Sequence, residues 1–401
     1  MRKVYVVAAK RTATGSMLGS LKNIDATDFG AEVVKALLAE TKVEGKDVSE
    51  VIVGNVLSAG LGQGPGRQVA VKAGVPVEVP AYSVNMLCGS GMKSIMTGFT
   101  AIRDGFDEIV IAGGIESMSR APHLVPSSIR GGVKMGDFKL TDHMIYDALT
   151  DAYSQVHMGV TAENIAKKFG ITRQEQDEFA YASQVKAIKA VDDGLFDGEI
   201  VPIVIKDRKG DIIFNRDEYP NRTTNLEKLA ALRPAFVKDG SVTAGNSSGI
   251  NDGAAFVMLM SEEAVKKYNL KPLAEIVGIG QGGVDPQYMG LGPVAAIGDV
   301  MKRSGYKLRD MEVVELNEAF AAQSLGVLKS LVEEHGVTLE ELLKKTNIQG
   351  GAIALGHPVG ASGARILVTL VHIMQRHDHK VGLASLCIGG GMGTAVILKR
   401  I

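Results

Sequence analysis

The sequence is poor in cysteine and has no long apolar run. Its 401 residues include only two cysteines, Cys88 and Cys387. A secreted disulfide scaffold is cysteine-dense, so the two thiols are expected to serve packing or chemistry in a reducing compartment, and a cytoplasmic location is predicted. No uninterrupted apolar stretch approaches the roughly 20 residues that span a bilayer. The N-terminal apolar run, residues 4–9, is too short for a signal peptide and favours a buried first strand.

A strong net charge is also absent. The formal net charge is -1, so no whole-molecule field points to nucleic acid or to a membrane, and neither is a predicted partner. Hydrophobic residues make up 45% and charged residues 22%, as in an ordinary globular protein, and the length predicts two or three domains. The 48 glycines cluster at a few turns, where the backbone must bend sharply or approach something closely.

Short β-branched runs alternate with helical patterns, which predicts parallel sheets covered by helices, the α/β class. In each half a strand, a helix and a later strand follow one another: the predicted strands are 51–56, 108–112, 312–316 and 381–387, and the predicted helices are 90–103, 318–331 and 361–375. This similarity resembles an internal duplication. Two such halves side by side would bring Cys88 and Asn317 to one crevice, where α/β sheets usually bind ligands.

Two segments lack regular periodicity. Residues 115–160 are expected to form a lid or docking loop, and residues 207–250 are a second loop-rich stretch. Between them, Thr172 and Glu175 form a capping box that predicts the start of a helix.

Cys88 precedes a predicted helix and is followed by Gly89 and Gly91. A helix N-terminus lowers the pKa of a thiol, and bare backbone leaves the sulfur accessible, which favours a nucleophile. A buried cysteine acting as a small hydrophobic residue is the competing interpretation, and this local pattern leaves both open.

Three positions in the second half are further candidates. His357 lies in a glycine-rich loop before Pro358. It could act as a base, or it could serve only to shape the turn. Asn317 is an N-cap by default, and its amide could also hold a water or a substrate oxygen. Cys387 ends a predicted strand and is expected to be buried, and the glycines at 389–391 could form a nest of N–H groups for an oxyanion.

Other patterns are rejected. Residues 245–249 fit the nucleophile-elbow string, but a strand-like run follows instead of a helix. Residues 278–283 fit the dinucleotide string, but no helix follows. The histidines at 372, 377 and 379 are expected to neutralise a helix C-terminus, and no metal site is predicted.

Several strings together resemble the thiolase family over nearly the whole chain. They are Cys-Gly-Ser-Gly at 88–91, Val-Thr-Ala-Gly-Asn at 242–246, Asn-Glu-Ala-Phe at 317–320, Gly-His-Pro at 356–358 and Cys-Ile-Gly-Gly-Gly-Met-Gly at 387–393. The segment at 157–159, His-Met-Gly, is similar to the biosynthetic, acetoacetyl-CoA-type subgroup. The resemblance implies a thiolase fold, with two pseudo-symmetric βαβαβαββ halves in a five-layered α-β-α-β-α arrangement. The implied domains are 1–118 with 250–275, a loop domain at 119–249 for tetramer and coenzyme A contacts, and 276–401.

The resemblance also implies an acetyl-CoA C-acetyltransferase, a homotetramer that joins two acetyl-CoA into acetoacetyl-CoA through an acyl-cysteine. Coenzyme A thioesters would be substrates, with no tightly bound cofactor. The implied catalytic residues are Cys88 as nucleophile, His357 and Cys387 as bases, Asn317 holding a water, and the N–H of Gly389. The implied coenzyme A contacts are Leu149, His157, Met158, Arg222, Phe236, Ala244, Ser248 and Ala319. Met86 and Asn221-Arg222 depart from the family pattern, in which glutamine and an immediate arginine are common.

Three alternatives remain. A degradative 3-ketoacyl-CoA thiolase would take longer chains. A ketoacyl synthase would pair its cysteine with two histidines, or with one histidine and one asparagine, rather than with a second cysteine. A non-catalytic lipid carrier on a decayed scaffold would not need the four intact catalytic candidates.

Overall fold

The computed structural model describes residues 2–401, so Met1, with which the first predicted domain begins, lies outside the described residues. The largest element is an 11-stranded sheet with the order β13-β14-β15-β12-β1-β11-β5-β3-β4, in which β2 also pairs with β11 and β8 with β1. Its strands are β1 (Val4–Thr12), β2 (Gly15–Ser16), β3 (Glu50–Gly54), β4 (Ala81–Val84), β5 (Ile109–Ser117), β8 (Ile200–Val201), β11 (Asn251–Ser261), β12 (Ala274–Gly283), β13 (Val313–Leu316), β14 (Val381–Ile388) and β15 (Met392–Arg400).

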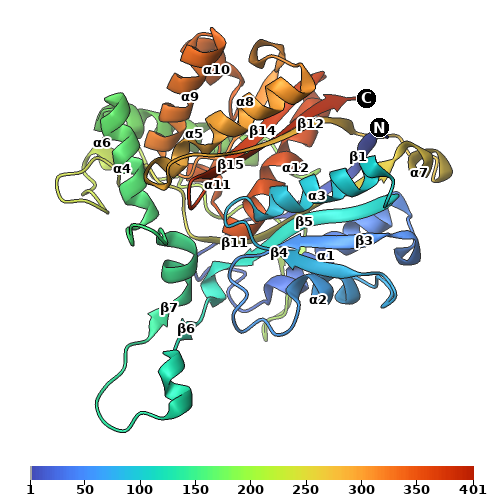
Figure 1. The fold of residues 1–401 in the computed structure, drawn as a ribbon, viewed down its shortest axis with the longest axis horizontal. Coiled ribbons are helices and arrows are strands. Elements are labelled where there is room, and N and C mark those ends of the chain that lie inside the picture. Colours follow the sequence, from blue (N-terminus) through green and yellow to red (C-terminus); the bar gives the residue numbers. More distant parts are fainter. Residues whose placement is uncertain (1) are drawn as a thin grey trace.

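The sheet has two halves, which join where β1 pairs with only the first residues of β12. The helices that cover it are α1 (Ala26–Thr41), α2 (Pro65–Lys72), α3 (Ser90–Asp104), α4 (Met158–Phe169), α5 (Arg173–Asp192), α6 (Leu226–Ala230), α7 (Glu262–Lys267), α8 (Gly292–Ser304), α9 (Ala321–His335), α10 (Leu339–Lys345), α11 (Ala352–Leu355) and α12 (Val359–His377). Figure 1 shows α3 and α12 near the middle of the molecule.

Three apolar cores define the layers. One joins α1 and α2 to the N-terminal half of the sheet, and another joins α4, α8 and α9 to the C-terminal half. The core between them contains residues of α3 and α12, such as Ile95 and Leu367, packed against strands of both halves. This gives the five-layered α/β arrangement, with α3 and α12 in the central layer.

The prediction of parallel sheets is confirmed for only part of the sheet. The pairs β3–β4, β3–β5 and β13–β14 are parallel, but β11 runs antiparallel to β1 and β5, and β15 runs antiparallel to β12 and β14. The physical reason is visible at β14 and β15, which are joined by a tight turn at Gly389–Gly391. A connection that short permits only an antiparallel pair, whereas a parallel pair needs a long crossover.

Most of the other predicted elements are confirmed. Helices α3 and α12 and strands β3, β13 and β14 lie within a few residues of their predicted bounds. The capping box at Thr172 is present: its side chain accepts from the Glu175 N–H, and the Glu175 carboxylate accepts from the Thr172 N–H. Helix α9 begins three residues later than predicted, and β5 continues to Ser117, into the segment that was expected to be irregular.

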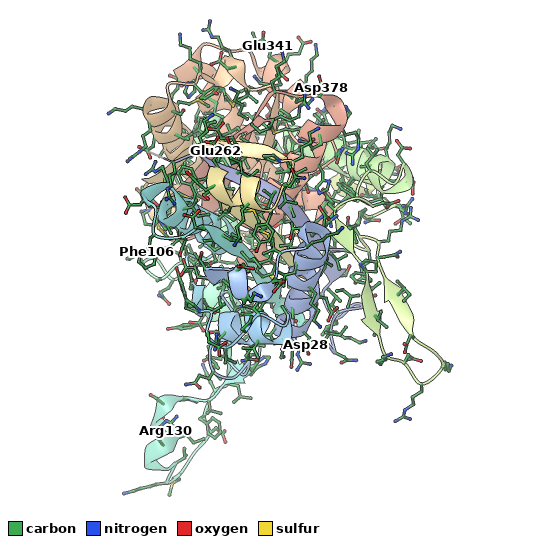
Figure 2. The ribbon with its side chains drawn as sticks, turned by 90° about the vertical axis from the view of Figure 1, so that its right-hand side faces the viewer. Asp28, Phe106, Arg130, Glu262, Glu341 and Asp378 are labelled. Atoms are coloured by element: carbon green, nitrogen blue, oxygen red, sulfur yellow. The ribbon has the colours of Figure 1, made fainter. Side chains whose placement is uncertain are left out.

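Two segments project from the layered body. One contains β6 (His123–Leu124) and β7 (Thr141–Asp142), with a short 3-10 turn at Ser127–Gly131 between them (Figure 1). Arg130 marks this segment in Figure 2, where the hairpin of β9 (Ile203–Ile205) and β10 (Ile212–Phe214) projects on the other side. Both lie within residues 119–249, and the three-part division of the chain stays a prediction.

Across residues 2–401, the helices are either too short or too polar to cross a membrane.

Candidate active site

Cys88 lies in a tight turn between β4 and α3. Leu87 has a positive φ of 48°, and Gly89 is the N-cap of α3. The Ser90 hydroxyl holds the turn, because it accepts from the Met86 N–H at 2.8 Å and donates to the Leu87 carbonyl at 2.6 Å. A Cβ on Gly89 would stand 2.3 Å from the side chain of Ile388. A side chain at 89 would therefore displace Ile388, because the C-terminal half approaches the cysteine turn closely.

The environment of Cys88 keeps it a neutral thiol. Burial raises the pKa of Cys88 to about 11, while the backbone N–H groups of Gly389 and of Cys88 itself act in the opposite direction. We expected the N-terminus of α3 to lower this pKa, but desolvation of the thiolate outweighs it. The two N–H groups lie beside the sulfur, where they can stabilise negative charge that develops during a reaction.

The side chain of Asn251 holds the backbone of His357. The backbone N–H of His357 donates to Asn251 Oδ1 at 3.0 Å, and Asn251 Nδ2 donates to the Gly15 carbonyl at 3.0 Å. Gly356 has a φ of 94°, and a Cβ there would stand 2.5 Å from the Asn251 amide. Glycine at 356 therefore permits both the left-handed turn and the close approach of Asn251.

The imidazole of His357 is neutral. Burial, and then the charge of Arg365, lower the pKa of His357 to about 3. A neutral ring has an unprotonated nitrogen that can accept a proton from a thiol.

Cys387 is the next-to-last residue of β14 and is 1% exposed. Burial, and then the charge of Cys88, raise the pKa of Cys387. The strand ends at Ile388 and is followed by the glycine turn at 389–391, in which Gly390 and Gly391 have positive φ. Cys387 therefore places a second thiol beside the glycine turn that carries the N–H of Gly389.

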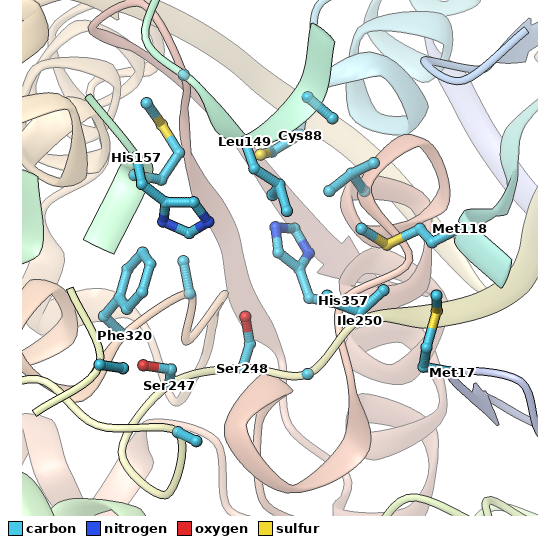
Figure 3. A pocket seen from close by; sticks show the side chains of 18 of the residues that line it. Met17, Cys88, Met118, Leu149, His157, Ser247, Ser248, Ile250, Phe320 and His357 are labelled. Carbon is cyan, nitrogen blue, oxygen red and sulfur yellow. The ribbon is translucent and has the colours of Figure 1, made fainter. Parts of the chain in front are cut away.

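The sulfurs and the imidazole meet at one cavity of about 520 Å³, which is lined by Cys88, His357, Cys387 and Gly389 and which we call the central cavity. Figure 3 shows the His357 ring near its centre, with Cys88 and Leu149 on one side and His157 and Phe320 on another. The expected meeting of the two thiols and the histidine is therefore found. Seven predicted coenzyme A contacts also line this cavity: Leu149, His157, Met158, Phe236, Ala244, Ser248 and Ala319.

An aromatic group forms one wall of the central cavity. The His157 ring stacks on Phe236 with centroids 4.7 Å apart, and Phe236 meets Phe320 edge-on at 6.0 Å. His157 Nδ1 accepts from the Gly159 N–H at 3.1 Å, and burial lowers the pKa of His157. The ring is therefore neutral, and its remaining N–H can donate to a bound ligand.

Asn317 is not a helix N-cap. Helix α9 begins at Ala321 with Phe320 as its N-cap, so the default interpretation of Asn317 is wrong. The side chain is fully buried, and neither of its amide atoms has a hydrogen-bond partner among residues 2–401. Asn317 is absent from the lining of the central cavity, although Ala319 and Phe320 belong to it. A buried amide of this kind is available to a polar guest.

Arg222 lies away from the central cavity. Its guanidinium donates to both carboxylate oxygens of Asp192, at 2.9 and 2.7 Å, and Arg216 contacts the same carboxylate. Asp192 at the end of α5 thus fixes this arginine on the surface. The structure does not bring Arg222 to the other predicted contacts, and its role with the nucleotide stays a prediction.

Several apolar residues that line the central cavity were not predicted from the sequence, namely Met17, Met118, Tyr219, Ile250, Met289, Phe320 and Val359. Two of them carried a signal in the sequence that could have marked them as lining residues: Met118 follows the end of β5, and Phe320 belongs to the 317–320 string. The two rejected strings form neither a nucleophile elbow nor a dinucleotide-binding turn. The Ser247 hydroxyl donates to the Thr243 carbonyl at 2.7 Å, and residues 278–283 belong to strand β12.

Comparisons with known proteins agree over the full length. Residues 4–263 match the family described as "Thiolase, N-terminal domain" and residues 270–400 match "Thiolase, C-terminal domain". Acetyl-CoA acetyltransferase of Chromobacterium violaceum is 53% identical, covering 99% of this chain and 100% of the relative. That of Pseudomonas aeruginosa is 52% identical, covering 100% of both chains.

Solved structures are similar over the full length of this chain. Acetyl-CoA acetyltransferase from Syntrophomonas wolfei has a TM-score of 0.97 and 44% identity, covering 100% of both chains. Human mitochondrial 3-ketoacyl-CoA thiolase in complex with CoA has a TM-score of 0.93 and 46% identity, covering 100% of this chain and 98% of that one.

Proposed function

The chain belongs to the thiolase family and is an acyltransferase, and from this premise we propose that it reversibly condenses two acetyl-CoA into acetoacetyl-CoA and free coenzyme A. The observation that carries the proposal is the meeting of Cys88, His357 and Cys387 at the central cavity. A nucleophile, a neutral base and a second thiol are the groups that an acyl transfer followed by carbon–carbon bond formation requires.

The first half-reaction acylates Cys88. His357 accepts the Cys88 proton while the sulfur attacks the thioester carbonyl carbon, and the bond from that carbon to the sulfur of coenzyme A breaks. The N–H groups of Cys88 and Gly389 stabilise the oxyanion that forms. The leaving thiolate takes the proton of Cys387, so coenzyme A departs as its free thiol. A high pKa for Cys387 makes the remaining thiolate a strong base.

The second half-reaction forms the carbon–carbon bond. The Cys387 thiolate removes a proton from the α-carbon of a second acetyl-CoA, and the resulting enolate attacks the acyl carbon on Cys88. The bond from that carbon to the sulfur of Cys88 breaks, and His357 returns its proton to this sulfur. By family resemblance, His357 and a water held by Asn317 stabilise the enolate oxygen. The unpartnered amide of Asn317 supports this role.

The chain length of the substrate is the first point to test, since one similar structure is a 3-ketoacyl-CoA thiolase. The central cavity of about 520 Å³ must hold the end of the coenzyme A arm as well as both acyl groups, which leaves little room for a long chain. In a coenzyme A-dependent cleavage assay, kcat/KM should therefore fall by roughly tenfold or more between four- and eight-carbon 3-ketoacyl substrates. An equal or higher value for eight carbons would favour the degradative alternative. Cys88→Ala is the control for cleavage without the enzyme's nucleophile.

A homotetramer in the cytoplasm completes the proposal. The projecting segment around β6 and β7 carries exposed apolar side chains, among them Met135, 95% exposed, and Phe138. Apolar surface of this kind supports a contact between subunits. Sedimentation should give four chains of 42.4 kDa, and Met135→Ser with Phe138→Ser should shift the mass to dimers. Phe106→Ser, at an exposed site on another segment, is the control. A wild-type dimer would contradict the tetramer, and cell fractionation tests the location.

A further inference from the structure

Ser362 lies directly behind the imidazole of His357. It belongs to the first turns of α12 and is fully buried. Its hydroxyl oxygen is 2.6 Å from His357 Nδ1 and 2.8 Å from the carbonyl oxygen of Pro358. The steps described above leave this hydroxyl without a part in the reaction.

The protons at this contact can be counted. A serine hydroxyl has one proton to donate, and a carbonyl oxygen can only accept. The 2.8 Å contact with Pro358 therefore takes the hydroxyl proton, because two oxygens at that distance with no proton between them would repel. The Ser362 oxygen can then only accept from His357, so the ring proton is on Nδ1. A neutral ring has one N–H, and Nε2 is left unprotonated.

We propose that Ser362 is a positioning residue that fixes the neutral ring of His357 as its Nδ1–H tautomer and so leaves Nε2 as the proton acceptor for Cys88. The proposal rests on the proposed function and deepens it. The opposite tautomer would carry a proton on Nε2 and could not accept one from the thiol. During the reaction Nε2 takes the Cys88 proton while Nδ1–H keeps donating to Ser362, and Nε2 gives the proton back when Cys88 leaves the product.

The partner of the ring is a neutral hydroxyl rather than a carboxylate. No full negative charge is then in contact with the imidazolium that forms, and the neighbouring Arg365 disfavours it further. Burial and Arg365 together agree with a histidine that is neutral in the free enzyme and carries the proton only from the attack of Cys88 until Cys88 leaves the product. The tautomer matters more under these conditions, because no charge is present to draw the proton onto the correct nitrogen.

Neutron diffraction on the wild-type enzyme tests the assignment directly. A deuteron on His357 Nδ1 and none on Nε2, with the Ser362 deuteron directed at the Pro358 carbonyl, is the expected result. A deuteron on Nε2 would overturn the proposal and would leave the thiolase reaction itself untouched. The measurement needs no variant, so it remains decisive even where a substitution impairs folding.

Kinetics give the second test. Ser362→Ala should slow single-turnover acylation of Cys88 by acetyl-CoA by roughly 10- to 100-fold, less than complete loss of a general base would, because the base itself remains, with KM changed less than about twofold. Ser362→Thr, which keeps a hydroxyl, should restore part of the rate. Ser304→Ala is the matched control, because the Ser304 hydroxyl also donates to the carbonyl four residues earlier, at 2.7 Å, but lies on α8, away from the central cavity. An acylation rate of Ser362→Ala equal to that of wild type would reject the positioning role. If the wild-type enzyme itself formed no acetoacetyl-CoA from acetyl-CoA, the proposed function would be rejected instead.

Discussion

Cys88→Ser should form no acyl-enzyme and should lower the condensation rate by roughly 10⁴-fold or more, the scale at which loss of a nucleophile usually acts. An alcohol is a much weaker acid than a thiol. The base available to it, His357, has a pKa of about 3, because the ring is buried and lies near Arg365. Such a base can share the proton of a thiol during attack but cannot generate an alkoxide. The N–H groups of Cys88 and Gly389 would still bind the carbonyl oxygen, but no nucleophile would reach the carbon.

The measurement is covalent labelling. The variant and wild type are mixed with acetyl-CoA labelled in the acetyl group, quenched, and examined by intact-protein mass. Wild type should carry one acetyl group and Cys88→Ser none. Cys88→Ala is the control that separates a slow serine from no nucleophile at all, and equal melting temperatures show that the fold is kept. Labelling of Cys88→Ser at the wild-type rate would refute the assignment of the nucleophile.

Local signals in the sequence predicted the elements that hold the site. The helix after Cys88 and the capping box at Thr172 depend on residues a few positions apart, so the sequence contains the whole cause. The ends of predicted strands placed Cys88 and Asn317 at one crevice, where α/β folds usually bind ligands. That Cys88, His357 and Cys387 would meet was implied by the family resemblance that the short strings around them carry.

Features that depend on distant packing were not predictable in the same way. The pKa of Cys88 is raised because the folded chain buries the thiol, which the helix start at Gly89 does not reveal. The cap assigned to Asn317 failed because α9 starts only at Ala321. Scattered lining residues such as Met118 and Met289 carry no motif, and only the assembled fold shows which apolar side chains face the central cavity.

The other large effect is expected at the second thiol. Cys387→Ser should still acylate Cys88, within about tenfold of the wild-type rate, but should lower condensation by roughly 10²- to 10⁴-fold, the range for loss of a general base. Acylation survives because Cys88, His357 and the N–H of Gly389 are unchanged, and the thiolate of coenzyme A can leave without help. Condensation fails because a serine in that buried position would have to become an alkoxide to remove the α-proton. Burial already raises the pKa of the native thiol, so an alcohol there is still less available as a base.

Two rates measured on one sample separate these steps. Rapid mixing with acetyl-CoA should release one coenzyme A per site from Cys387→Ser in a burst, after which release should nearly stop and the acetyl label should remain on the protein. Cys387→Ala should behave in the same way, because the hydroxyl contributes nothing as a base. Equal labelling of Cys88→Ser and Cys387→Ser would contradict the division of labour between the two thiols. If Cys387→Ser condensed at the wild-type rate, a different base would have to remove the α-proton. That base would be His357, the other proton acceptor of the mechanism, which also lines the central cavity.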